Sequence, residues 1–274
     1  MELAEVFDRA ASKLPSVPKV VQELIASFDR DDTDIDDVAR KVSHDQVITA
    51  KVLRMANSAR ISGGNPVKTI DDAVVRLGFD ALRVLVVASG ISSMQVPNDT
   101  FNRQAFWRHS FEVANTCKWL AKHAGLDGNQ AYTCGLLANI GELLIHVAFP
   151  GQSLKIDRLV ESGADRIQLE SMELGLDLTQ VGEELAKRWQ FPADIQRAIR
   201  QQRNPTAHTP FEPYAGLIAL AELLVHLFTH QASPEQVADT LPANILQMLN
   251  INAEKLVANL EQGREICLAV DDLL

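Results

Sequence analysis

The sequence predicts an all-α protein, because apolar residues recur at helical spacing along most of the chain and almost never alternate with a period of two. Of the 274 residues, 46% are hydrophobic and 23% are charged, which is ordinary for a globular protein with a sizeable core. The chain shows no internal repeat and no heptad run, which argues against a solenoid and a coiled coil. A bundle of packed helices is therefore expected.

In the first third of the chain, apolar faces and N-cap residues mark the expected helices. Val17, Val20 and Leu24 share one face at helical spacing. Thr69-Ile70-Asp71-Asp72 has the capping-box pattern that begins a helix, and Gly78 is expected to end it. The expected segments are residues 17–28, a helix beginning near residue 33, and residues 45–58, 69–78 and 82–91.

Residues 94–103 mark the predicted boundary between two lobes, because proline and other helix-breaking residues gather there. The N-terminal lobe would cover residues 1–95 and the second lobe residues 98–274. In the second lobe, Asp177 and Ser233 are expected to serve as N-caps. Its expected helices are residues 101–123, 135–149, 152–162, 164–173 and 177–189, a helix beginning near Pro192, and helices around 217–228, 234 onward and 256–260.

Charge and cysteine usage limit the classes of partner and compartment. The 26 basic and 36 acidic residues give a net charge of -10, which argues against a nucleic-acid partner. Cys117, Cys134 and Cys267 are widely spaced, which is typical of reduced, buried thiols. The first residues lack a signal-peptide core, and the apolar runs at 135–149 and 217–228 are too short to cross a membrane. The sequence thus predicts a cytoplasmic protein with no membrane partner.

Motifs in the first half of the chain resemble those of the HDOD domain, a helical output domain of bacterial signalling proteins related to the HD metal-dependent phosphohydrolases. The motifs are Leu14-Pro15-Ser16-Val17-Pro18, residues 45–59 reading DQVITAKVLRMANSA, and residues 69–78 reading TIDDAVVRLG. Gln46 replaces a proline that is usual in the second motif. The resemblance covers about residues 14–230 and implies an HD-domain, phosphodiesterase-like helical bundle of two packed lobes.

The positions that hold metal ligands in active HD phosphohydrolases carry other residues in this chain. Ala138 and Asn139, between Gly135 and Gly141, replace the His-Asp pair of that family. An alanine methyl cannot bind a cation, and a neutral amide is a weak ligand for divalent metals. The resemblance implies a degenerate site, with no metal, cofactor or catalytic residue, and with the two glycines as packing positions. Its positions are His109, Ala138, Asn139, Leu178, Gln202, Arg203 and Glu222.

A relocated polar site is one alternative. Asn139, Glu142 and His146 are spaced i, i+3 and i+7, so they would share one face of a single helix, to which His109 could be added from a neighbouring helix. Such a group could form a carboxylate–histidine site. The favoured interpretation is a hydrogen-bonded polar cluster in which Glu142 satisfies His146 one turn later.

A second candidate surface lies on the predicted helix at residues 45–58. Lys51, Arg54, Asn57 and Ser58 follow one another at spacings of three, three and one, so most of them share a face. A solvated polar face is the favoured interpretation, and an anion- or partner-docking surface is the alternative.

These features predict a non-catalytic regulatory module that binds a partner protein or a small ligand. The resemblance places it near two-component or cyclic-dinucleotide signalling, and because the sequence carries no fused signalling module, a signalling protein is expected to bind in trans. Its acidic surface suits a basic partner. The alternatives are a divergent metal-dependent phosphohydrolase acting on a cyclic dinucleotide or other nucleotide, and a nucleotide sensor without hydrolysis. The cations available to such a sensor are Arg54, Arg188, Arg200 and Arg203.

Overall fold

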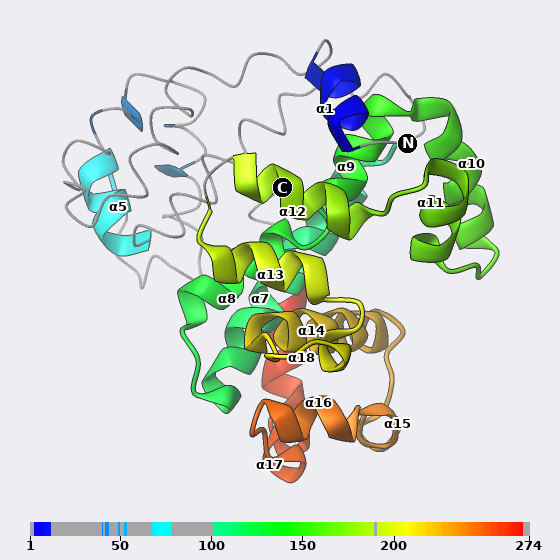
Figure 1. Cartoon of the computed structure of the whole chain (residues 1–274). Helices are drawn as coiled ribbons and strands as arrows, with labels where there is room; N and C mark the ends of the chain where they lie inside the picture. Colours follow the sequence, from blue (N-terminus) through cyan, green and yellow to red (C-terminus); the bar gives the residue numbers. More distant parts are fainter. Residues whose placement is uncertain are drawn as a thin grey trace.

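The computed structural model describes residues 3–11, 40, 42–43, 49, 52–53, 67–77, 101–188 and 191–270. In these residues every regular element is a helix, which confirms the all-α fold class (Figure 1). The helices are α1 (Leu3–Ala11), α5 (Ile70–Leu77), α7 (Arg103–Ala124), α8 (Gly128–Leu137), α9 (Ile140–Ala148), α10 (Pro150–Glu161), α11 (Arg166–Leu174), α12 (Leu178–Arg188), α13 (Ala193–Gln201), the short 3-10 helix η1 (Pro205–Ala207), α14 (Pro213–Thr229), α15 (Pro234–Thr240), α16 (Ala243–Met248), α17 (Ala253–Ala258) and α18 (Leu260–Leu268).

Several predictions for the N-terminal part fall outside the described residues. They are the helices at 17–28, near 33 and at 82–91, most of the helix at 45–58, and the lobe boundary near residue 95. The division into two lobes therefore stays a prediction. Within the described part, the N-cap half of the predicted capping box at the start of α5 is confirmed: the Asp72 backbone N–H donates to Thr69 Oγ1 at 3.1 Å, and the Thr69 hydroxyl donates to Asp72 Oδ2 at 2.7 Å.

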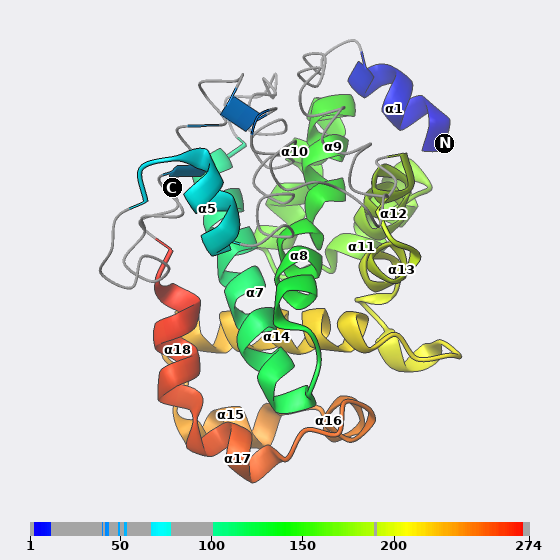
Figure 2. The same ribbon diagram turned by 90° about the vertical axis from the view of Figure 1, so that its left-hand side faces the viewer.

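The centre of the described bundle is built on α7, α8 and α14, and α14 runs across the other two (Figure 2). Gly135 lets α7 and α8 approach closely, because a Cβ there would lie 2.8 Å from the Ala114 Cα. Gly141 does the same for α9 and α12, where a Cβ would lie 1.9 Å from the Leu178 carbonyl oxygen. Both glycines are therefore packing positions, as the sequence predicted.

The predicted continuous helix over residues 135–149 is wrong in one respect, because the chain breaks between α8 and α9. Asn139 has φ -101° and ψ 13°, outside the helical range, and the Ala138 N–H bonds to the Gly135 carbonyl, only three residues earlier. The Gln202 side-chain amide donates to the Ala138 carbonyl at 2.7 Å. The break thus falls at the two degenerate positions, and a residue from α13's end stabilises it.

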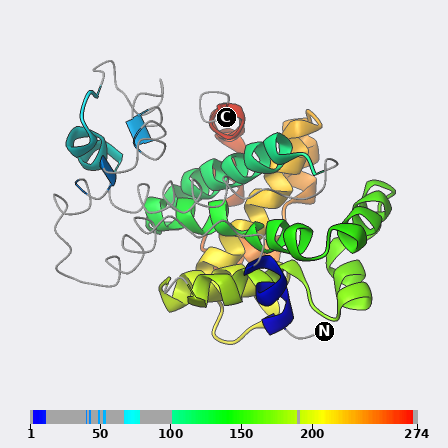
Figure 3. The ribbon, with the colours of Figure 1, turned by 90° about the horizontal axis from the view of Figure 1, so that it is seen from above.

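Helices α10 and α11 form a hairpin at one edge of the molecule (Figures 1 and 3). Pro150 lies in the first turn of α10, and Asp165 caps α11 by accepting from the Gln168 N–H at 2.8 Å. Both helices were predicted. Gly175, with φ 73°, ends α11 in the left-handed region that favours glycine.

The C-terminal helices agree with the sequence in part. Ser233 caps α15 as predicted, and with Gln236 it forms a full capping box that was not predicted from the sequence. The single helix predicted around residues 256–260 is instead two, α17 and α18, separated at Asn259, and α16 was not predicted. Helix α18 packs on α7 through Gly263, where a Cβ would lie 2.7 Å from the ring of Trp119.

Among the described residues one stretch, Gly128–Ala148, is long and apolar enough to cross a membrane by length and composition alone, and it extends beyond the apolar run at residues 135–149 noted in the sequence. Its 18-residue window is 94% buried inside the protein, which is typical of a core segment. All three cysteines are buried, as predicted, and none forms a disulfide within the described residues.

Candidate functional site

Four of the degenerate positions come together although they lie on separate elements. His109 lies on α7, Asn139 precedes α9, Arg203 follows α13 and Glu222 lies on α14. His109 Nε2 lies 2.9 Å from Glu222 Oε2, and Asn139 Nδ2 donates to Glu222 Oε1 at 2.6 Å. Arg203 Nη2 donates to Asn139 Oδ1 at 3.3 Å. We call these four residues the HD-position network.

The protonation of the HD-position network follows from its geometry. Burial would lower the pKa of His109, but the hydrogen bond and the charge of Glu222 outweigh it and raise that pKa. Burial would raise the pKa of Glu222, but the hydrogen bond and charge of His109, with the charge of Arg203, hold it below its usual range. An imidazolium–carboxylate pair is therefore favoured, and an arginine lies beside it.

The remaining degenerate positions, Ala138, Leu178 and Gln202, bond elsewhere and add no side chain to the HD-position network. Leu178 is fully buried, and its N–H donates to Glu170 Oε2 at 2.7 Å. The Gln202 amide bonds the Ala138 and Ile199 carbonyls at 2.7 and 2.9 Å and does not bond to Glu222. Ala138 is fully buried, and its side chain contributes only a methyl group.

The HD-position network does not fit the divalent metal that the fold implies. Its single carboxylate already has a partner at each oxygen, His109 at one and Asn139 at the other. Arg203 adds a positive charge where a metal site needs anionic donors, since such sites use several converging imidazoles, thiolates or carboxylates. The arrangement can bind and orient hydrogen-bonding groups at its partly exposed edge, where His109 is 42% exposed.

Comparison with known proteins identifies the family. The HDOD domain matches residues 14–205, more than half of the chain. The chain belongs to the HDOD domain family. The fold is similar to that of a protein from Shewanella amazonensis SB2B described as a candidate phosphohydrolase, with 34% identity over 99% of this chain and 98% of that chain and a TM-score of 0.80.

Two further relatives extend the comparison. An HDOD domain protein of unknown function from Geobacter sulfurreducens is 26% identical over 99% of this chain and 98% of its own, with a TM-score of 0.77. An uncharacterized protein of Treponema pallidum (strain Nichols) is 25% identical over 256 residues, 92% of this chain. This chain spans only 49% of the length of that relative.

The predicted residual site of the HDOD domain is split between two places. His109 and Asn139 belong to the HD-position network, whereas the hydrogen bonds of His146 run to the Glu142 backbone carbonyl and to Asp157 Oδ2, each at 2.8 Å. Glu142 does satisfy His146 one turn later, as favoured from the sequence, but through its backbone carbonyl and not its carboxylate. The spacing rule failed because Asn139 precedes the helix.

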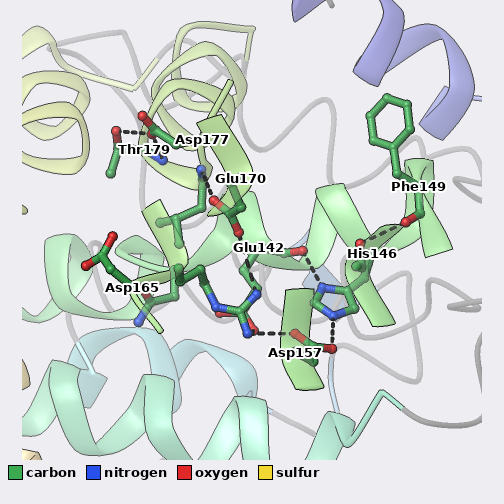
Figure 4. Close-up of polar contacts among 12 residues, drawn as sticks. Glu142, His146, Phe149, Asp157, Asp165, Glu170, Asp177 and Thr179 are labelled. Carbon is green, nitrogen blue, oxygen red and sulfur yellow. Dashed lines mark hydrogen bonds and ion pairs between the residues drawn. The ribbon is translucent and has the colours of Figure 1, made fainter. Parts of the chain in front are cut away.

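Glu142 and His146 join three residues that the sequence did not single out. Arg166 Nη2 bonds Asp157 Oδ1 at 2.6 Å and lies 3.6 Å from Glu142 Oε1, and its Nη1 lies 3.6 Å from Glu170 Oε1. Figure 4 shows the carboxylates and His146 gathered in one group. We call Glu142, His146, Asp157, Arg166 and Glu170 the α9–α11 cluster. No motif connects them, and only the i, i+4 spacing of Arg166 and Glu170 hinted at a pair.

The α9–α11 cluster shifts the pKa of four of its members. For Arg166, burial is outweighed by the charges of Glu142, Asp157 and Glu170 and by the hydrogen bond of Asp157, which raise the pKa. Burial raises the pKa of Glu170 to about 7, although the Leu178 N–H opposes this. For His146, burial is outweighed by the hydrogen bond of Asp157, which raises the pKa. For Asp157, burial is outweighed by the hydrogen bonds of His146 and Arg166, which lower the pKa.

The predicted docking face at Lys51, Arg54, Asn57 and Ser58 lies outside the described residues. It stays a prediction of the sequence.

Proposed function

We propose that this HDOD domain is a non-catalytic regulatory module of bacterial signalling that binds a partner protein in trans. The observation that carries the proposal is the HD-position network, in which Glu222 accepts hydrogen bonds at both oxygens and Arg203 stands beside Asn139. In this arrangement the carboxylate oxygens that could bind a metal are paired with side chains of the protein. The framework that the glycines hold together remains available for binding.

A nucleotide sensor is less favoured, because the cations that it would use have other partners. Arg188 bonds Glu184 at 2.9 Å, Arg200 bonds Thr179 at 2.9 Å, and Arg203 bonds Asn139. The fourth, Arg54, lies outside the described residues. Binding a phosphate would therefore require these contacts to be exchanged.

The enzymatic alternative rests on the relative described as a candidate phosphohydrolase, which is 34% identical. Phosphate release from cyclic dinucleotides and (p)ppGpp, measured with Mg²⁺, Mn²⁺ or Zn²⁺, separates the two functions. The matched control is Glu222→Gln, which removes the single carboxylate of the HD-position network. We expect the wild-type protein to release no more phosphate than this variant. Release that Glu222→Gln abolishes would support the enzyme instead.

Partner binding is tested by affinity capture from the native cytoplasm with mass spectrometry. The double variant Lys51→Glu/Arg54→Glu reverses the charge of the predicted docking face, and Arg158→Glu, a single charge reversal at an exposed position of α10, is the control for a charge reversal elsewhere on the surface. We expect a protein that the wild type and Arg158→Glu capture equally and that the double variant loses. Direct titration of the purified partner must then reproduce this order. Equal affinity of all three proteins would remove the docking face from the proposal.

A further inference from the structure

The strongest unassigned feature outside the HD-position network is a group of three potential metal ligands. Glu142 and His146 on α9 and Asp157 on α10 bring one ligand atom each to within 4.8 Å of one another. The His146 side chain is 1% exposed, whereas those of Glu142 and Asp157 are 21% and 25% exposed. The imidazole is therefore buried, and the two carboxylates are partly exposed to solvent.

The orientation of His146 is fixed in the way that metal-binding histidines are usually fixed. Its Nδ1 lies 2.8 Å from the Glu142 carbonyl oxygen, which can only accept, so Nδ1 carries the hydrogen. The other nitrogen, Nε2, then points at Asp157 Oδ2 at 2.8 Å. An imidazole lone pair and a carboxylate oxygen meet at this distance only with a positive centre between them, a proton or a metal ion.

Charge supplies an independent observation. The α9–α11 cluster has three carboxylates and one guanidinium, so two negative formal charges remain when Glu170 is ionised and His146 is neutral. Glu170 is fully buried, and among the described residues none donates a hydrogen bond to its Oε1. Glu170 Oε1 lies 3.6 Å from Arg166 Nη1, within the same cluster. A buried carboxylate oxygen without a donor is costly, and a divalent cation nearby would balance the charge.

We propose that Glu142, His146 and Asp157 bind one divalent transition-metal ion, for which Zn²⁺ is the appropriate probe. One imidazole and two carboxylates are donors that zinc accepts, and three protein ligands leave a fourth position for water. Ligand atoms around tetrahedral zinc lie roughly 3.4 Å apart. On binding, the distance between His146 Nε2 and Asp157 Oδ2 would therefore lengthen slightly, and the Glu142 carboxylate would move closer to both. Asp157 Oδ1 keeps its bond to Arg166, which then orients the ligand from outside.

Calorimetric titration of metal-stripped protein with ZnCl₂ tests the site. We expect one saturable site in the wild type, and affinity weakened by at least about tenfold in Asp157→Asn and in His146→Gln. Asp157 is partly exposed, so Asp157→Asn decides the matter if the buried His146→Gln fails to fold.

Three controls separate this site from others. Glu173→Gln removes a carboxylate that joins α10 and α11 through Lys155 at the surface, at 2.8 Å. His109→Gln tests the HD-position network. His226→Gln tests the exposed pair of His226 and His230, whose ring centroids lie 4.3 Å apart. All three should bind Zn²⁺ like the wild type. The proposal is overturned by the absence of saturable binding, by full affinity in Asp157→Asn, or by loss of binding in any of these controls.

Discussion

The two polar groups on either side of α9 differ in how completely they pair their own atoms. In the HD-position network the Glu222 carboxylate has a partner at both oxygens, and Arg203 adds a cation. In the α9–α11 cluster three carboxylates share one guanidinium, and Glu170 Oε1 lacks a hydrogen bond within the described residues. In the first group side chains of the protein satisfy the carboxylate, whereas the second carries net negative charge when Glu170 is ionised and His146 is neutral.

The largest expected effect comes from breaking the framework that holds both groups. Gly141→Ala places a Cβ 1.9 Å from the Leu178 carbonyl, so α9 and α12 must separate. We expect a loss of about 3 kcal/mol or more in the free energy of unfolding, or failure to fold. Gly151→Ala is the control, because a Cβ there meets nothing within 4 Å. Equal denaturation midpoints for the two variants would contradict the close approach.

A change inside the HD-position network should be smaller but specific. Asn139→Asp replaces the donor that lies 2.6 Å from Glu222 Oε1 by a second carboxylate. We expect a loss of about 1–3 kcal/mol at neutral pH without metal, measured by urea unfolding. Asn129→Asp, at an exposed position on α8, should have little effect. If Asn139→Asp were as stable as the wild type, the Asn139–Glu222 hydrogen bond would contribute nothing.

The metal-free protein should become less stable as pH rises, and the Glu170→Gln variant measures how much of that loss comes from the α9–α11 cluster. The pKa of Glu170 is raised to about 7, so its ionisation destabilises the fold as pH rises from the unfolded value near 4.5 through 7. The raised pKa values of His109 and His146 act in the same direction, because their stabilising charge is lost above the folded pKa. We expect a higher melting temperature at pH 6 than at pH 8 in EDTA. Glu170→Gln should reduce this difference, and a profile unchanged by it would exclude Glu170 as a cause.

The smallest effect is expected at the exposed edge of the HD-position network. Arg203→Gln removes an exposed guanidinium whose contact with Asn139 Oδ1 is 3.3 Å long. Exposed polar contacts contribute little, so we expect a change below about 0.5 kcal/mol, similar to that of Arg158→Gln. A loss several times larger in chemical unfolding would mean that Arg203 acts as the structural cation of the site.

The sequence predicted the helices that carry strong local signals and the positions that meet at the HD-position network. His109, Asn139, Arg203 and Glu222 converge because the family's framework is kept, and the motifs reveal that framework. The break between α8 and α9 was missed, because the apolar pattern continues through it and its stabilising donor, Gln202, lies far along the chain.

The α9–α11 cluster could not be predicted, because its members meet only through tertiary packing. Asp157 and Arg166 belong to a hairpin whose docking onto α9 leaves no short-range pattern. The polar group expected around His109 and His146 separated for a related reason: Asn139 is not helical, so residues before and after it do not share a face.

Anomalous diffraction from crystals soaked in ZnCl₂ tests the contrast between the two groups most directly. We predict a zinc peak among Glu142, His146 and Asp157, and an intact His109–Glu222 contact with no peak beside it. A zinc ion bound between His109 and Glu222 would contradict the central claim that hydrogen bonds of the protein have replaced the metal there.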